Sequence, residues 1–406
     1  MAAAARLAKR GHAVTLFEER GALGGSWAPW ALPGTDLLVD EAPAVTGFPA
    51  PWRDLFRKSG RPLEAELARA GYALVPAAPP RYRFTDGSEL VLPTDRGEQH
   101  AVLVAAYGPA VAARWRDLVD ALDDVWQALR PLGLESAFDR ADLRRDVRRR
   151  LWSRRTVADL ADRLGDPRLG AVVRSVAHRR GSAPGRTPAL AAVDLTVART
   201  FGRWQVEPLP GGAGDPGRSS VLTELLAQRL ALRQVDVRTG RTADRVSRRD
   251  GGGFVVLAGP DEVPVDAVVL AVDPWSAARL APALRPPSRR LSPARSPLVR
   301  HTRTDLAPAG VEETVVLDEE GVPVVTYARP AGDGGLESVH DFRHGAPRPE
   351  LGVAADGFRS WSRRPGTTTA VPRLVLAGAG PAAGADASRL VLSGALASYA
   401  LSGRER

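Results

Sequence analysis

The sequence predicts an α/β chain with two domains: a doubly wound, Rossmann-like domain built on a parallel sheet, and a mixed α+β domain. Two observations predict the first domain. Residues 11–25 read as a helix end, a buried strand and a glycine turn, and residues 373–401 read as a strand, a glycine turn and a terminal helix. A third observation predicts the second domain, because residues 79–132 carry a hairpin signal followed by apolar residues at helical spacing.

The amino-terminal stretch supplies a helix, a strand and an acid. Residues 1–10 are alanine-rich and predict a helix that Gly11 closes in a left-handed conformation. Residues 14–17 form an apolar run, long enough for a parallel strand buried on both faces. Glu18 ends that strand, where doubly wound folds place an acid that accepts hydrogen bonds from the adenosine ribose. The alternative is that Glu18 is a solvated charge, with Arg20 as its salt-bridge partner.

Composition excludes several classes of protein. The 406 residues, 44% of them hydrophobic, can build two domains with ample cores. The net charge of +9 comes almost entirely from scattered arginines, so we expect no nucleic-acid partner. The absence of cysteine excludes disulfides, thiolate metal sites and thiol nucleophiles. No apolar run approaches the length of a membrane span, which predicts a cytoplasmic protein.

Motifs of several other chemistries are missing from the sequence. It contains no G-K-S/T phosphate loop, no H-E-x-x-H and no G-x-S-x-G elbow. Among six histidines, His340 and His344 have a spacing that would place them on one helix face. Gly345 and Pro347 nearby favour a loop instead, so we predict no metal site.

Residues 17–27, FEERGALGGSW, resemble the E-x-R-x-x-x-G-G segment of the phytoene desaturase and amine oxidase group of FAD-dependent oxidoreductases. Residues 38–60 resemble the next segment of the phytoene desaturases, in which Asp40, Pro43 and Val45 keep the pattern. The resemblance implies a two-domain FAD-binding Rossmann-like fold with a mixed α+β substrate domain. Paired glycines let backbone approach a phosphate closely. The cofactor contacts implied here are Glu18, Arg20, Gly24 and Gly25.

The phosphate-binding fingerprint of such folds is not found where it is expected. G-x-G-x-x-G should stand about 20 residues before the acid, whereas 17 residues precede Glu18. Two explanations stay open. The translation start is assigned too far downstream, which we favour, or the chain is a truncated relative that binds no flavin.

The middle of the chain predicts the substrate domain. Residues 79–95 predict a hairpin around Asp86-Gly87, similar to the hairpin that opens this domain in the desaturases. Residues 97–132 predict a helix whose tryptophan and leucine stripe is read as core. Residues 134–180 predict arginine-rich helices that either lie on an anionic membrane or present a solvated face. Their apolar side is Leu143, Val147, Leu151, Val157 and Leu160.

The chain then returns to the nucleotide domain near Trp204. Residues 219–232 predict a helix and residues 235–238 a strand, which resemble the family's Pro-x-Gly-Gly segment and imply that Val237 contacts the adenine. Residues 251–272 predict a β-meander. Residues 285–364 contain strand-like pieces at 313–317 and 323–327 and match the family least, so part of the substrate cavity is expected to be shortened.

Residues 373–401 resemble the family's closing motif, whose glycine turn and helix start cover the ribityl chain and ring of the flavin. A helix start aimed at the ring stabilises the negative charge of the reduced flavin. Ala382-Ala383 replaces the usual His-Pro, and Ser388-Arg389 replaces Pro-Gly. The residues that keep the pattern, or lie in the helix that follows, are Gly378, Ala379, Gly380, Gly384 and Leu390.

The predicted domains alternate along the chain. The FAD-binding domain takes residues 1–75, 204–275 and 371–406, and the substrate domain takes residues 76–203 and 276–370. We expect FAD as cofactor and hydride transfer from an apolar isoprenoid or polyene-type substrate, with no catalytic residue named because no general base is needed. Peripheral membrane contact stays open, and the oligomeric state is undecided. The alternatives are an amine or porphyrinogen oxidase on the same fold, and a catalytically silent relative that acts as a scaffold.

Overall fold

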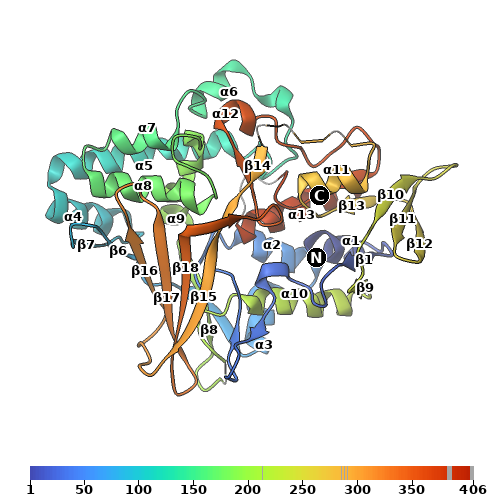
Figure 1. Ribbon diagram of the computed structural model, residues 1–406, viewed down its shortest axis with the longest axis horizontal. Helices are drawn as coiled ribbons and strands as arrows, with labels where there is room; N and C mark the ends of the chain where they lie inside the picture. The colour runs from blue at the N-terminus through green and yellow to red at the C-terminus, as the bar shows by residue number, and fades with distance from the viewer. Residues whose placement is uncertain (213, 285, 288, 290, 382–385, 403–406) are drawn as a thin grey trace.

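The computed structural model describes residues 1–212, 214–284, 286–287, 289, 291–381 and 386–402 (Figure 1). Its elements form two groups. One group combines the beginning, the middle and the end of the chain, so that the N- and C-terminal labels lie close together in the view. The other group combines long antiparallel strands with a layer of helices above them.

Two pairs of parallel strands form the nucleotide-binding half. β1 (Thr15–Glu18) pairs with β9 (Asp236–Thr239), and β13 (Val268–Leu270) pairs with β20 (Leu374–Leu376). Within the described residues no ladder joins β1 to β20. The other edge of β20 is covered where the Leu376 N–H donates to the Thr367 carbonyl at 2.8 Å.

Helices pack around these strands: α1 (Ala2–Lys9), α2 (Ala50–Ser59), α3 (Leu63–Arg69), α10 (Ser220–Leu232) and α13 (Ala387–Ser402). α1 and α13 meet through small residues, since a Cβ added to Gly394 would lie 2.8 Å from the Ala2 Cβ. The predicted helix at 219–232 and the predicted strands at 14–17 and 235–238 are confirmed within one residue, but β1 is half-buried along its whole length and not buried on both faces as predicted.

The predicted meander is also confirmed. β10 (Arg245–Arg248), β11 (Phe254–Ala258) and β12 (Asp261–Val265) form an antiparallel sheet that leads into β13. α11 (Pro274–Leu280) follows β13, and the Asp273 carboxylate caps it by accepting the N–H groups of Trp275 and Ser276 at 3.0 and 2.9 Å.

A six-stranded sheet forms the second half, in the order β15-β18-β17-β16-β6-β7. The bounds are β6 (Arg81–Arg83), β7 (Glu89–Val91), β15 (Arg295–Thr304), β16 (Glu312–Leu317), β17 (Pro323–Ala331) and β18 (Gly334–Pro347). The β6–β7 hairpin is the predicted one: Gly87 has φ 79°, and the Asp86 carboxylate accepts the Ser88 N–H at 2.9 Å.

The loop predicted at His340 and His344 is wrong, because both residues lie in β18. Gly345 and Pro347, which suggested a loop, stand at the end of this strand. There the register with the partner strand β15 shifts, since Ser296 pairs with Ala346 but Leu298 pairs with Asp341, and a strand end tolerates a proline that lacks an N–H donor.

A layer of helices covers this sheet (Figure 1): α4 (Arg96–Tyr107), α5 (Pro109–Leu129), α6 (Arg145–Arg150), α7 (Val157–Asp162), α8 (Pro167–Arg179) and α9 (Val193–Phe201). The single helix predicted at 97–132 is two helices, because Gly108 adopts φ 80° and Pro109 begins the second. The predicted core stripe is confirmed by buried Trp115, Leu122 and Trp126.

The arginine-rich stretch points its apolar side into the protein. Leu143, Leu151, Val157 and Leu160 are buried in the core of this half, whereas all the arginines of α6 are exposed or half-exposed to solvent. The apolar side is therefore covered by the fold. No helix among the described residues is long and apolar enough to cross a bilayer.

Short elements connect the two halves. β4 (Thr46–Gly47), β8 (Arg203–Pro208) and β5 (Tyr72–Pro76) form one sheet, and β2 (Trp30–Ala31) pairs with β3 (Leu38–Val39). β14 (Leu291–Pro293) pairs with β19 (Val353–Ala355), which leads to α12 (Gly357–Trp361). The 3-10 turns are η1 (Gly25–Trp27), η2 (Arg140–Asp142) and η3 (Ala189–Ala192). The domain boundaries stay a prediction.

Candidate cofactor and substrate site

The β1–β9 pair brings two predicted cofactor residues together. Leu16 stands opposite Val237 and Glu18 opposite Thr239, so the side chains of Glu18 and Val237 lie on the same face of this ladder. One Glu18 carboxylate oxygen accepts the Arg20 N–H at 3.0 Å. Among the described residues the other oxygen has no hydrogen-bond partner, which leaves an acceptor for a hydroxyl group.

The glycine turn after β1 needs glycine at two positions. Gly24 has φ 112° and Gly25 has φ 60°, in the left-handed region that side chains rarely adopt. A Cβ on Gly24 would lie 3.1 Å from the Ala28 nitrogen, whereas a Cβ on Gly25 would meet nothing within 4 Å. Gly25 therefore borders open space. The exposed Arg20 fixes this turn to the end of β9, because its carbonyl accepts the Gly240 N–H at 2.8 Å.

The closing turn begins directly after β20. Gly378 has φ 91°, Ala379 is buried, and a Cβ on Gly380 would lie 2.8 Å from Pro274 Cγ. Leu390 is half-buried in the first turn of α13. Ala382, Ala383 and Gly384 lie outside the described residues. The turn therefore lies against α11, and the close contact requires small residues at these positions.

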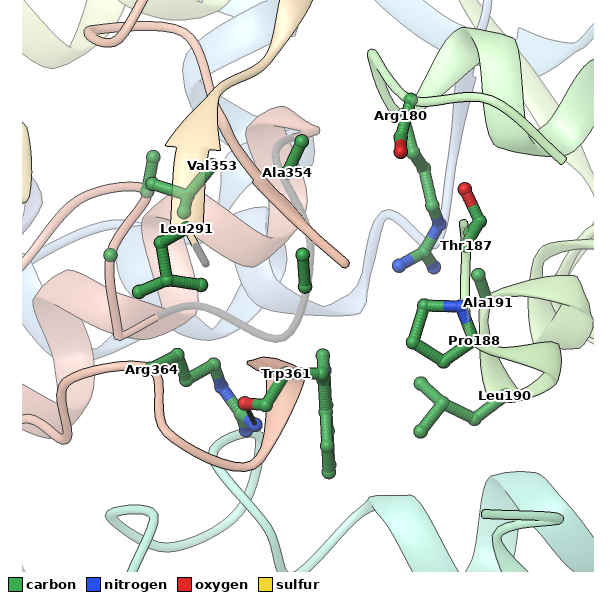
Figure 2. Close-up of a pocket in the computed structure, with 14 residues that line it drawn as sticks. Arg180, Thr187, Pro188, Leu190, Ala191, Leu291, Val353, Ala354, Trp361 and Arg364 are labelled. Atoms are coloured by element: carbon green, nitrogen blue, oxygen red, sulfur yellow. Dashed lines mark hydrogen bonds between the residues drawn. The ribbon is translucent and has the colours of Figure 1, made fainter. Parts of the chain in front are cut away.

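A cavity of about 60 Å³ lies beside the closing turn (Figure 2). Ala379 and Gly380 contribute to one wall, and the other residues come from the segment around η3, from β14 and β19, and from α12 and the residues after it. Most of this lining is apolar, with two arginines: Leu190, Ala191, Leu291, Val353, Trp361, Arg180 and Arg364.

An ionic cluster stands behind the cavity. Asp194 in α9 accepts hydrogen bonds from Arg180 at 2.7 and 2.8 Å and from Arg389 in α13 at 2.7 Å. Arg389 also pairs with Asp386. Burial by itself raises the pKa of the Asp194 carboxyl, but Arg180 and Arg389 outweigh this effect and hold the pKa well below its ordinary value. Arg389, which departs from the desaturase pattern, therefore fastens α13 to the helical layer.

Comparison with known proteins identifies the family. The family described as flavin containing amine oxidoreductase matches residues 1–305. The chain belongs to this family.

Two curated relatives of the chain are a desaturase and a dehydrogenase by name. The chain is 31% identical over 289 residues to hydroxyneurosporene desaturase of Cereibacter sphaeroides, covering 68% of this chain and 54% of the relative. It is 29% identical over 318 residues to phytoene dehydrogenase of Streptomyces griseus, covering 75% of this chain and 58% of the relative. The chain therefore spans just over half the length of these relatives, and the resemblance to phytoene desaturases is confirmed.

Solved structures confirm the fold class. An oxidoreductase from Methanosarcina mazei superposes with a TM-score of 0.64 at 13% identity, covering 97% of this chain and 96% of that one. Putrescine oxidase bound to putrescine superposes with a TM-score of 0.63 at 16% identity, covering 98% and 95%. At such identities the likeness concerns the fold alone.

FAD is the cofactor that this family indicates, and the described residues fit parts of it. Glu18 offers a free carboxylate oxygen for a ribose hydroxyl, and Val237 lies on the same face. Gly25 borders open space at the turn, where backbone can approach a phosphate. Gly378 to Gly380 place a tight turn against the cavity. The residues that would hold FAD are therefore Glu18, Val237 and Gly25 at its adenosine and phosphate part, and Gly378 to Gly380 at its ring.

Sequence reasoning missed several residues around this site. Arg364 was not singled out, because an arginine-rich sequence gives no sign of which arginine is buried. Asp194 and Trp361 were not singled out, because Arg389 and Phe138, which they contact, are distant in sequence. Asp40 was noted only as part of a motif. Its buried carboxylate accepts the Ser220 N–H at 2.9 Å and so caps α10, and burial raises its pKa.

A second buried cluster lies between the six-stranded sheet and the elements packed on it. Glu313 in β16 pairs with Arg179 of α8 at 3.3 Å and with Arg203 of β8. Its pKa is raised by burial but lowered further by the two arginines, so the net shift is downward. Nearby His340 is buried with its ring at 5.3 Å from that of Tyr327, and burial lowers the His340 pKa to about 4.

Proposed function

We propose that this chain is an FAD-dependent oxidoreductase that removes a hydride from an apolar isoprenoid or polyene-type substrate. The observation that carries the proposal is the cavity beside Ala379 and Gly380 of the closing turn, lined mainly by apolar side chains. Bound FAD supplies the hydride acceptor. The names of the two curated relatives, a hydroxyneurosporene desaturase and a phytoene dehydrogenase, support a substrate of this class.

The residues of this chain would contribute binding, orientation and exclusion of water. Glu18 would accept hydrogen bonds from the ribose, and Val237 would pack beside the adenine. The closing turn would hold the ring against the cavity, where Leu190, Leu291 and Trp361 keep water from the reacting carbon. Such chemistry needs orientation more than a general base, so no catalytic residue is named.

An amine oxidase on the same fold is the second candidate, favoured by the fold shared with putrescine oxidase. The cavity argues against it. Arg364 lines the cavity and pairs with no carboxylate among the described residues, and its positive charge opposes entry of an ammonium group. A catalytically silent relative is the third candidate.

Peripheral contact with an anionic membrane belongs to this proposal as well. It rests on the exposed arginines of α6, Arg145, Arg148, Arg149 and Arg150. Because the apolar side of this stretch is covered by the core, we propose contact through charge alone.

The test is the visible absorption spectrum of the purified chain, followed by anaerobic titration with an acyclic polyene hydrocarbon and, separately, with putrescine. We expect flavin bands that bleach with the hydrocarbon and not with the amine. Bleaching by putrescine alone would replace the proposal with the amine oxidase. A protein with no flavin bands, even after incubation with FAD, would be the silent relative.

A further inference from the structure

Arg364 is a buried arginine in contact with two aromatic rings. Its side chain is 7% exposed, and its Cζ lies 3.9 Å from the ring centroid of Phe138 and 4.0 Å from that of Trp361. The centroids of these two rings are 5.8 Å apart and the ring planes are inclined by 57°, so the rings contact the guanidinium from adjacent sides and do not sandwich it. These contacts bury the guanidinium at the wall of the cavity.

The donors of Arg364 are incompletely satisfied. One Nη donates to the Leu132 carbonyl at 2.7 Å and the other reaches the Trp361 carbonyl at 3.4 Å. Nε is buried with no hydrogen-bond partner. Within the described part of the chain no carboxylate pairs with this guanidinium. Arg364 lines the cavity, and a buried charge without a counter-charge is costly, so this side chain indicates an anionic ligand in the cavity.

The other arginine of the cavity is already neutralised. Arg180 makes a two-pronged contact with Asp194, and Arg389 shares the same carboxylate and that of Asp386. The positive charges of the two arginines are therefore balanced by the negative charges of the two carboxylates. Arg364 has no such counterpart, and burial lowers its pKa to about 9, which leaves it charged at neutral pH. The cavity therefore carries one uncompensated positive charge.

Figure 2 shows Arg364 and Trp361 on one side of the cavity and Arg180, Pro188 and Leu190 on the other. The volume of about 60 Å³ has room for about four to six water-sized groups, since one water needs roughly 10–15 Å³ on this measure. This space suits a small head group and the first carbons of a chain.

We propose that the cavity binds the carboxylate end of an apolar acid, with the carboxylate paired to Arg364 and the chain against Leu190, Leu291 and Trp361. A carboxylate matches the planar guanidinium and balances one positive charge. The inference rests on the proposed function in taking this cavity as the substrate's. It narrows the substrate from a hydrocarbon to an apolar chain that ends in an acid.

The test is isothermal titration calorimetry of the full chain with octanoate and with octan-1-ol, two probes that share an eight-carbon chain and differ in charge. The variants are Arg364→Gln, Arg364→Lys and, as a matched control, Arg363→Gln at the exposed neighbouring position. We expect octanoate to bind at least tenfold more tightly than octan-1-ol. Arg364→Gln should lose at least tenfold for octanoate and leave octan-1-ol within twofold, while Arg363→Gln changes neither.

Equal binding of the two probes by the wild-type chain would overturn the inference, as would full octanoate affinity in Arg364→Gln. Octyl phosphate binding tenfold more tightly than octanoate would overturn the assignment to a carboxylate. Circular dichroism checks that Arg364→Gln folds. If Arg364→Gln does not fold, the inference is tested by two other results: the preference of the wild-type chain for octanoate over octan-1-ol, and the partial retention of that preference in Arg364→Lys. Octanoate binding by a chain whose flavin the polyene hydrocarbon does not bleach would remove the proposed function and leave this inference standing.

Discussion

The Arg389 guanidinium donates to the Asp194 carboxylate at 2.7 Å across 195 positions of the chain. This contact joins the first turn of the closing helix α13 to α9 in the helical layer. Because Arg180 uses the same carboxylate, Asp194 compensates two cations, of which Arg180 lines the cavity. Removing its charge would leave both without their main partner.

We therefore expect Asp194→Asn to lower the free energy of unfolding by about 3 kcal/mol, the lower end for breaking a buried ion pair, because Asp194 is half-buried. Urea denaturation measures this. The control is Asp386→Asn, whose side chain is 45% exposed and should change stability by less than about 1 kcal/mol. Equal losses of stability in Asp194→Asn and Asp386→Asn would contradict this prediction.

The stabilisation by Asp194 also depends on pH. Since the Asp194 pKa is depressed in the fold, this stabilisation is present above about pH 4 and is lost as pH falls further.

Stability should also depend on pH through His340. Burial lowers its pKa from 6.5 to about 4, so between these values the unfolded chain binds a proton that the folded chain does not. The free energy of unfolding therefore decreases by up to about 3 kcal/mol as pH falls through this window. His340→Gln should flatten the decline in thermal or urea midpoints between pH 6.5 and 4, whereas the exposed His12→Gln should leave it unchanged. An unaltered decline in His340→Gln would refute this role.

Glu313→Gln should destabilise the second half of the molecule. The carboxylate is 2% exposed and pairs with Arg179 and Arg203, so neutralising it leaves two buried cations. We expect a loss of about 3–5 kcal/mol in the free energy of unfolding. Glu312→Gln, one residue away on the exposed face of β16, should cost less than about 0.5 kcal/mol. Denaturation curves of the pair give the difference, and similar values would argue against the buried cluster as the cause.

Gly394→Leu should separate α1 from α13. A Cβ at this position would lie 2.8 Å from the Ala2 Cβ and 3.1 Å from the Ala3 nitrogen, so the larger side chain forces the helices apart at a cost of about 1–3 kcal/mol. Ala400→Leu on the exposed side of the same helix is the control and should be neutral. Thermal denaturation distinguishes the two variants. A Gly394→Leu protein as stable as the control would show that the helix contact yields without cost.

Glu18→Gln should weaken FAD binding roughly tenfold, because hydrogen bonds to a charged acceptor contribute about 1.5–3 kcal/mol. Flavin fluorescence quenching on titration with FAD measures the affinity. Glu19→Gln removes an equal charge from the exposed neighbour and controls for long-range electrostatics. If both variants bind FAD alike, Glu18 only ends the strand with a solvated charge.

Local patterns predicted the elements that are defined by neighbours in sequence. The strand ending at Glu18, the Asp86-Gly87 hairpin and the helix at 220–232 follow from apolar periodicity and turn residues, and all are confirmed. The long strands β15 and β18 were missed because their many charged and polar residues, with the glycines and prolines near their ends, hide the apolar alternation of a strand, although β18 pairs with its sequence neighbour β17. Arg364 was missed for another reason: the rings of Phe138 and Trp361 that bury it come from two segments over 200 residues apart.

The cofactor contacts predicted at Glu18 and at Gly378 lie on two ladders that share no backbone hydrogen bond within the described residues. Their spacing is therefore set by side-chain packing, such as the contact of Gly394 with Ala2, and is softer than the spacing within one sheet. A ligand that contacts both strand pairs would hold them at a fixed distance from each other. Amide exchange in β1 and β20 should slow together when it binds, and the cofactor would become part of the architecture that holds it.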